Sequence, residues 1–173
     1  MGRKANKGRY AVGKKSFGLL SAVVLAMAML ALPVAQADDA ERQSYKEAVE
    51  PICKANTQAN ERILKGVRGK VRAGKLKAAA GQFSRAATAL RKTHKELKAV
   101  PQPPTDQAKL AKWLKYVEEE ANLFQKTAKK LNAGDKNGAL AMVIKLEHNA
   151  NLANNQVLGF EFRYCRFEPS KFT

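Results

Sequence analysis

Apolar and small side chains recur every three or four residues over most of the chain after residue 37, which is the spacing of one face of an α-helix. Four such runs extend from Tyr45 to Val71, from Leu76 to Leu97, from Leu110 to Leu131 and from Leu140 to Val157. Before the C-terminal tail, no stretch alternates apolar and polar residues as a half-buried strand does. The pattern therefore predicts an all-α protein with four helices.

Glycine and proline separate these predicted helices. RAGK (72–75) and NAGD (132–135) each place glycine where a helix would stop, because glycine adopts the left-handed C-terminal conformation without a steric penalty. PQPPT (101–105) predicts a rigid linker, and Thr105 and Asp106 are candidate caps for the third helix. Pro51 lies inside the first run and predicts a kink or a new helix start there.

The two glycine turns align when the chain is shifted by 60 residues. VRAGKLKAAA (71–80) then lies over LNAGDKNGAL (131–140), and apolar positions of the flanking helices coincide as well. This is a weak internal repeat of two helical hairpins. Two hairpins joined by a short linker predict an up-down-up-down four-helix bundle. A three-helix core with a loose fourth helix is the alternative.

The first 37 residues have the three-part layout of a secretory signal peptide. Residues 1–18 contain six basic residues and no acid, 19–32 are all apolar or small, and AQA (35–37) suits cleavage before Asp38. A membrane anchor is the alternative, but the apolar run is shorter than the roughly 20 residues that a membrane span needs. We therefore expect residues 38–173 to form one exported domain, secreted or held in the periplasm or cell envelope.

Cys53 and Cys165 are the only cysteines, and both lie in the part expected to be exported. An even number of cysteines outside the cell predicts a disulfide, Cys53–Cys165, that ties the C-terminal tail back to the first helix. Gly159 is expected to end the fourth helix, with Phe160 in apolar contact just after it. Residues 160–165 fit either an extended strip or a continued helix.

Positive charge is concentrated in one segment. Six of the 32 basic residues and none of the 15 acidic ones precede Asp38, which leaves a net charge of +11 on residues 38–173. Residues 62–98 contain twelve basic residues and one acid, so this segment accounts for the whole net charge. In a bundle, both glycine turns would lie at the same end. Eight residues would gather there, and we call them the basic end: Arg68, Lys70, Arg72, Lys75, Lys77, Lys129, Lys130 and Lys136.

A cluster of this density attracts anionic partners, such as cell-wall polymers, lipid headgroups or, without sequence specificity, nucleic acid. The alternative is a solvated face of a generally basic protein. Aromatic residues are absent between Lys65 and Lys77, which argues against base stacking. The alanine-rich apolar face of this segment argues against deep insertion into a membrane.

No catalytic, metal or cofactor site is predicted. His94 and His148 lack the glutamate three residues earlier that a di-iron site uses, and the chain has no C-x-x-C-H run for covalent haem. We interpret both as surface or boundary residues. Residues 118–120 (EEE) and the Asn-rich residues 149–155 are interpreted as solvated helix faces, although the latter would also suit a polar ligand. Trp113 is expected in the core.

Several short motifs occur together in another group of proteins. They are Y-x6-IC-x2-N from Tyr45, the Pro-rich linker, WL at 113–114, A-G-D-x3-A from Ala133, and LGF at 158–160 followed by Cys165. In this combination the chain resembles small exported helical proteins and lipoproteins of actinobacteria that have no assigned function. The resemblance covers most of residues 45–165 and implies an exported bundle with one disulfide. This chain differs in lacking a lipid-attachment cysteine.

The sequence thus predicts a non-enzymatic protein that binds an anionic partner through the basic end. The alternative from another class is a structural or protein-binding module, in which the Asn-rich fourth helix or an alanine groove meets a partner and the charge only gives solubility. An enzyme is the third hypothesis, and a carboxylate or histidine buried in a deep cleft would favour it.

Overall fold

The computed structural model describes the backbone of residues 21–168 and the side chains of residues 38–168. The basic start of the predicted signal peptide, residues 1–18, lies outside the described residues, as do the side chains of its apolar run and of the predicted cleavage site. Contacts divide the chain into two units between Ala37 and Asp38. The second unit, Asp38–Thr173, contains both cysteines and the hydrophobic core formed by the described side chains.

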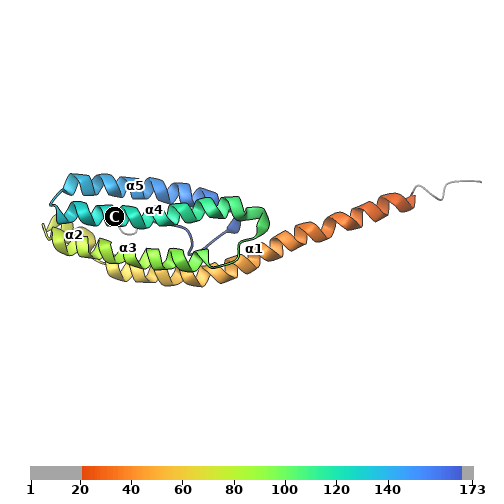
Figure 1. Cartoon of the computed structure of the whole chain (residues 1–173), viewed down its shortest axis with the longest axis horizontal. Coiled ribbons are helices and arrows are strands. Elements are labelled where there is room, and N and C mark those ends of the chain that lie inside the picture. Colours follow the sequence, from red (N-terminus) through yellow and green to blue (C-terminus); the bar gives the residue numbers. More distant parts are fainter. Residues whose placement is uncertain (1–20, 169–173) are drawn as a thin grey trace, which may run out of the picture. The chain divides into compact units, whose positions relative to one another are not determined.

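Four long helices and one short helix make up the described fold. They are α1 (Ser21–Leu64), α2 (Val67–Arg72), α3 (Leu76–Lys98), α4 (Gln107–Asn132) and α5 (Lys136–Gln156). Short 3-10 turns cover Pro104–Asp106 and Leu158–Phe160. In Figure 1, α4 lies between α3 and α5. The C-terminal part of α1 runs along α3, and a hydrogen bond from Gln82 to Ile63 O joins the two helices. The described residues contain no strand, which confirms the prediction of an all-helical protein.

The four long helices share one hydrophobic core. Its largest fully buried side chains include Trp113, Leu90, Leu97 and Leu131. Helix α5 contributes Leu146 and several alanines, which let it lie close to its neighbours. The fourth predicted helix is therefore packed into the core, and the alternative of a loose fourth helix is wrong.

The predicted new helix start at Pro51 is wrong, and the first helical run is interrupted elsewhere. Helix α1 continues through Pro51 without a new start, and Pro51 is exposed. The run breaks instead at Gly66, whose φ of 73° lies in the left-handed region that glycine adopts most easily. Because α2 begins directly afterwards at Val67, the predicted helix over 45–71 is two helices.

A buried glutamine stabilises this break. The Gln82 side chain of α3 donates hydrogen bonds from Nε2 to the carbonyl oxygens of Ile63 (2.6 Å) and Lys65 (3.0 Å). Carbonyl groups at the end of a helix have no partner within the helix, so a side-chain donor stabilises them. Gln82 Oε1 also accepts a hydrogen bond from Lys70 Nζ (2.9 Å). One side chain thus joins α1, α2 and α3.

The two glycine turns have the same backbone geometry. Gly74 and Gly134 have φ values of 71° and 75°. The N–H of Lys75 donates to Lys70 O (2.8 Å), and 60 residues later the N–H of Asp135 donates to Lys130 O (2.9 Å). In each turn this bond spans five residues, and the glycine N–H donates a second bond to the carbonyl oxygen three residues earlier. The two bonds together form the Schellman motif of helix C-termini. Both predicted helix stops are confirmed, and the repeat extends to the hydrogen bonds of the turns.

The second turn has a cap that the first turn lacks. Asp135 Oδ1 accepts a hydrogen bond from the N–H of Gly138 (2.7 Å), whereas Lys75 makes no such bond. A Cβ atom at Gly138 would overlap the Asp135 carboxylate. An alanine at this position would therefore require the Asp135 side chain to move and give up its cap.

The linker before α4 is held by an ion pair. Asp106 precedes the first residue of α4, but its side chain makes no capping bond, so the predicted capping role is wrong. Its carboxylate is 1% exposed and accepts hydrogen bonds from Arg42 Nε (2.5 Å) and Nη2 (3.2 Å). The pairing raises the pKa of Arg42, through the hydrogen bond first and the Asp106 charge second. A buried carboxylate needs such a partner, since an unpaired buried charge is strongly destabilising.

The C-terminal tail leaves the helix earlier than predicted. Helix α5 ends at Gln156, and Gly159 lies within the following 3-10 turn, so Gly159 does not end the helix. Glu161 has a φ of 51°, which turns the chain, and no helix follows it among the described residues. The alternative of a continued helix over 160–165 is therefore wrong. Phe160 and Phe162 are buried, and their rings stack with centroids 5.1 Å apart.

The disulfide between Cys53 and Cys165 is present and confirms the predicted pairing. It joins α1 to the tail, with the two Cα atoms 5.0 Å apart. The Glu50 carboxylate accepts hydrogen bonds from the N–H groups of Arg163 (2.5 Å) and Tyr164 (2.9 Å). The tail is thus tied to α1 by one covalent bond and two charge-assisted hydrogen bonds.

A Cys53→Ser variant should lose about 2–4 kcal/mol of unfolding free energy, because the disulfide closes a loop of more than 100 residues in the unfolded chain. It should also expose a titratable thiol at Cys165. Denaturant unfolding and thiol titration measure the two effects, with the Cys53→Ser, Cys165→Ser double variant as the thiol-free control. Unchanged stability with no titratable thiol would contradict the pairing.

Two glycine-to-alanine changes should separate the cap from helix propensity. Gly69→Ala lies within α2 with no atom near its Cβ, so it should add about 0.5–1 kcal/mol of stability. Gly138→Ala should be less stable than Gly69→Ala by about 1–2 kcal/mol, because the Asp135 cap must be released. Thermal and denaturant unfolding measure this difference. Equal stabilisation by both changes would show that the cap contributes nothing.

Candidate functional site

The structure brings the two glycine turns together at one end of the domain. The same shallow surface depression is lined by residues 74–78 of the first turn and by Leu131, Asn132 and Gly134 of the second. Arg68, Lys70 and Arg72 lie on α2, Lys75 and Lys77 flank the start of α3, Lys129 and Lys130 end α4, and Lys136 begins α5. All eight predicted residues of the basic end therefore lie on or beside the two turns. Seven of their side chains are exposed, and Lys70 is half-buried.

Two members of the basic end have partners within the fold. Lys70 donates to Gln82, and Lys130 forms an ion pair with Asp135 at 2.9 Å. The hydrogen bond from Lys130 is the main reason that the pKa of Asp135 is lowered, with the Gly138 N–H second. The other six make no ion pair with the described residues. These six are Arg68, Arg72, Lys75, Lys77, Lys129 and Lys136.

An apolar groove of about 330 Å³ opens beside these cations. Its apolar lining comes from α2, α3, α4 and α5. The apolar lining residues are Val67, Val71, Phe83, Leu131, Ala139, Leu140 and Val143. Arg68, Arg72 and Lys136 also line it. The sequence patterns missed this groove, because Leu140 and Val143 fit the apolar face of a helix and were expected in the core.

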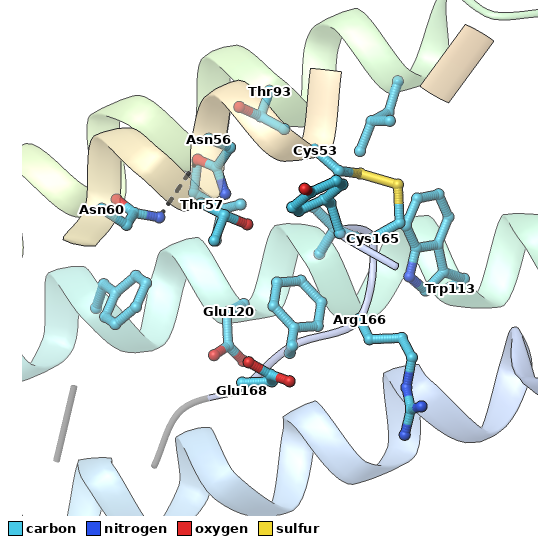
Figure 2. Close-up of a pocket in the computed structure, with 16 residues that line it drawn as sticks. Cys53, Asn56, Thr57, Asn60, Thr93, Trp113, Glu120, Cys165, Arg166 and Glu168 are labelled. Carbon is cyan, nitrogen blue, oxygen red and sulfur yellow. Dashed lines mark hydrogen bonds between the residues drawn. A yellow bond between two sulfur atoms is a disulfide. The ribbon is translucent and has the colours of Figure 1, made fainter. Parts of the chain in front are cut away.

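A second cavity, of about 60 Å³, lies inside the domain under the C-terminal tail. Figure 2 shows the disulfide at its edge, Asn56, Thr57 and Asn60 along α1, and Trp113 and Glu120 on α4. The cavity has room for a few water molecules. Trp113 Nε1 and Asn60 Oδ1 are buried without a hydrogen-bond partner among the described residues. The cavity is thus small and partly polar.

Glu120 is the most perturbed group of this cavity. Its side chain is 2% exposed, and Oε2 accepts a hydrogen bond from Asn149 Nδ2 of α5 at 2.7 Å. Burial raises the pKa of Glu120 to about 8, because a low-dielectric environment disfavours the charged form. The bond from Asn149 acts in the opposite direction with a smaller effect. Burial therefore favours the neutral, protonated form of this carboxyl group.

The interpretation of residues 118–120 as a solvated face is wrong for Glu120. The signal that could have revealed it is helical spacing, since Val117, Glu120 and Phe124 lie on one face of α4. The internal repeat also indicates that Glu120 faces the core. Glu120 aligns with Asn60 at the offset of 60, and both are buried.

The Asn-rich segment of α5 is also only partly solvated. Asn149 is buried and donates to Tyr116 O (2.9 Å) as well as to Glu120. Asn154 exchanges two hydrogen bonds with the backbone of Phe167, at 3.0 and 2.9 Å, and so holds the end of the tail. The prediction of a solvated amide face is therefore wrong at these two positions. Their amides position Glu120 and the tail.

The remaining candidate residues lie where their sequence patterns predict. Trp113 is buried in the core against Phe162, with ring centroids 5.8 Å apart. His94 is half-buried and His148 is exposed. Burial is the main cause of the lowered pKa of His94. Among residues 38–168, no group of histidines, cysteines and carboxylates is arranged to hold a metal ion.

Comparisons with known proteins add no relative. No family model, curated protein or solved structure matches this chain. The resemblance to exported actinobacterial proteins therefore stays a prediction. In the part of the chain that the structure describes, no helix combines the length and the apolar character needed to cross a membrane.

A Glu120→Gln variant should lose a pH dependence of stability that the natural protein has. Because the pKa of Glu120 is about 8 in the folded state and near 4.5 when exposed, the folded state holds the proton more tightly. The contribution of Glu120 to stability should be full below about pH 4.5 and fall by up to about 1.4 kcal/mol per pH unit as the pH rises towards 8. Glutamine imitates the neutral acid and should flatten this loss.

Urea unfolding between pH 5 and 9 measures this effect. Glu118→Gln, which changes an exposed neighbour, is the matched control and should retain the loss of stability towards pH 8. If Glu120→Gln and the natural protein lost stability in parallel, the buried carboxyl group would not be the cause.

Proposed function

We propose that this chain is an exported, non-enzymatic protein of the cell envelope that binds an anionic partner through the basic end. In this proposal residues 1–37 are a cleaved signal peptide, and the mature domain is an up-down-up-down four-helix bundle. The partner is a cell-wall polymer, a membrane surface or, without sequence specificity, nucleic acid. The disulfide supports an oxidising location, since structural disulfides are rare in the cytosol.

One observation carries the proposal. Six cations without an ion-pair partner among the described residues lie on or beside two adjacent turns, although α2 and the start of α5 are more than 60 residues apart in sequence. Neighbouring like charges raise the local positive potential and attract anions. The only carboxylate at these turns, Asp135, already accepts from Lys130 and Gly138. The six cations are exposed, so an anionic partner can reach them.

The internal cavity supports a binding role over a catalytic one. Glu120 has the raised pKa that a general acid often has. However, the cavity of about 60 Å³ is far smaller than the 300–1,000 Å³ of typical ligand pockets. The tail also covers it, held by the disulfide and by Asn154. An organic substrate would not fit beside this carboxyl group.

Charge reversal should test the basic end. The triple change of Arg72, Lys75 and Lys77 to Glu should weaken binding to heparin and to anionic vesicles at least tenfold, and should reduce the salt dependence of duplex DNA binding by about 2–3 in logarithmic slope. Lys70 is left unchanged because it supports Gln82. Binding is measured by titration from 50 to 300 mM salt.

The matched control reverses Lys92, Lys95 and Lys98 to Glu, near the other end of α3. It alters the net charge by the same amount and should weaken binding much less. Equal losses in the two variants would mean that the net charge, not the basic end, attracts the partner. Weak binding that neither variant alters would refute the proposal.

A protein-binding module remains the alternative, and one observation favours it. Leu140 and Ile144 of α5 are 60% and 59% exposed, which is unusual for large apolar side chains on one helix face. In this alternative, charge serves only solubility. Capture of a defined envelope protein that survives the triple charge reversal, but not Leu140→Ser, would support it.

A further inference from the structure

The groove at the basic end combines an apolar surface with positive charge. A charged polymer or a flat membrane surface would need only the positive charge. Seven apolar side chains line it, and three cations, Arg68, Arg72 and Lys136, share that lining. Thr127 is the remaining lining residue, and its hydroxyl group already donates to Leu123 O at 2.8 Å. The groove therefore offers a ligand apolar contact and positive charge, with no unused hydroxyl group.

We propose that this groove binds a single anionic lipid molecule, with one acyl chain along the apolar lining and its phosphate or carboxylate at Arg68, Arg72 and Lys136. The inference rests on the proposed function, because it names the ligand that the basic end receives. It also goes further, since it predicts a one-to-one complex with a monomeric lipid rather than adsorption to a charged surface.

The positive side of the groove explains why the ligand is an anion. Arg68 and Arg72 are one helical turn apart on α2, so both side chains lie on the same face. Lys136 reaches the same groove from the first turn of α5. Arginine binds phosphate and carboxylate through two parallel hydrogen bonds, and a headgroup here would meet cations from two helices. None of the three forms an ion pair within residues 38–168.

The apolar side of the groove explains why the ligand has a chain. Val67, Phe83 and Leu131 are nearly fully buried and form its inner part, while Leu140 is 60% exposed at its border. Covering Leu140 and the half-buried Val71 and Val143 with an acyl chain would remove apolar surface from water. A volume of about 330 Å³ is at the lower end of the range for small-molecule sites. It suits one flexible chain rather than a bulky ring system.

A second copy of this domain is a poorer occupant of the groove. Residues 38–173 carry a net charge of +11, and a symmetric contact would bring the same unpaired cations of both copies together. An anionic lipid neutralises these cations, whereas a second copy adds to their repulsion. Charge complementarity therefore selects the lipid.

Monomeric dodecyl phosphate is the probe, used below its micelle concentration and titrated into residues 38–173 with the disulfide intact. Calorimetry should give a one-to-one complex, and amide chemical shifts should change at the groove. Inorganic phosphate, which lacks the chain, and dodecyltrimethylammonium, which lacks the anion, should each bind at least tenfold more weakly. Equal binding of the cationic amphiphile would overturn the proposal.

Two exposed side chains of α5 provide a matched pair of variants. Leu140 lines the groove and Ile144 does not, yet their exposed fractions are nearly equal. Leu140→Ser should weaken dodecyl phosphate binding about tenfold, while Ile144→Ser should leave it unchanged. Neither change removes a buried side chain, and thermal unfolding verifies that both variants fold. If the two variants bound dodecyl phosphate with equal affinity, the acyl chain would not lie against Leu140, and the inference would be overturned.

The remaining outcomes separate this inference from the proposed function. If heparin and anionic vesicles bind in a salt-dependent way but monomeric dodecyl phosphate does not, the basic end is a polyanion surface and the lipid site is refuted. If none of these probes binds, both proposals fail. If sedimentation shows a dimer that Leu140→Ser dissociates, a second copy covers the groove and the lipid site is refuted.

Discussion

The C-terminal tail depends on its attachment to α1, and so does the interior beneath it. The Cys53–Cys165 disulfide makes this attachment covalent, and Glu50 adds two hydrogen bonds to the tail backbone. Because the tail cannot leave, Phe160 and Phe162 stay against Tyr45 and Trp113 in the core. Without it, Glu120 and the cavity around it would be open to water, and the raised pKa of Glu120 would lose its cause, which is burial.

The domain therefore has two ends with different physical characters. Towards one end, the disulfide and the packing of Phe160 and Phe162 hold the tail on the core, and the buried carboxyl group of Glu120 lies midway along α4. The other end consists of two glycine turns, an apolar groove and cations that the described residues leave unpaired. Even there, part of the charge is structural, because Lys70 supports Gln82 and Lys130 supports Asp135. The remaining cations are the ones on which the proposals of anion and lipid binding rest.

Much of the fold could be predicted because its signals are local. Helical spacing depends only on neighbouring residues, and Gly74 and Gly134 stop helices through their own backbone preferences. Predictions failed where a distant residue decided the outcome. Asp106 stands where a helix cap is expected, but its carboxylate forms an ion pair with Arg42 of α1 instead. Glu120 looks solvated, but Asn149 and the tail enclose it.

The sequence by itself determined the helical class, the helix stops at both glycine turns, the pairing of the only two cysteines and the segment that carries the charge. Each of these follows from local spacing, backbone preference or a simple count. Only the tertiary structure decided that Asn149 and the tail enclose Glu120, that Gln82 and Asn154 hold backbone groups of distant segments, and that Leu140 borders a groove instead of filling the core. These depend on which residues meet after folding, and a pattern along one helix gives the direction of a side chain but not what it contacts.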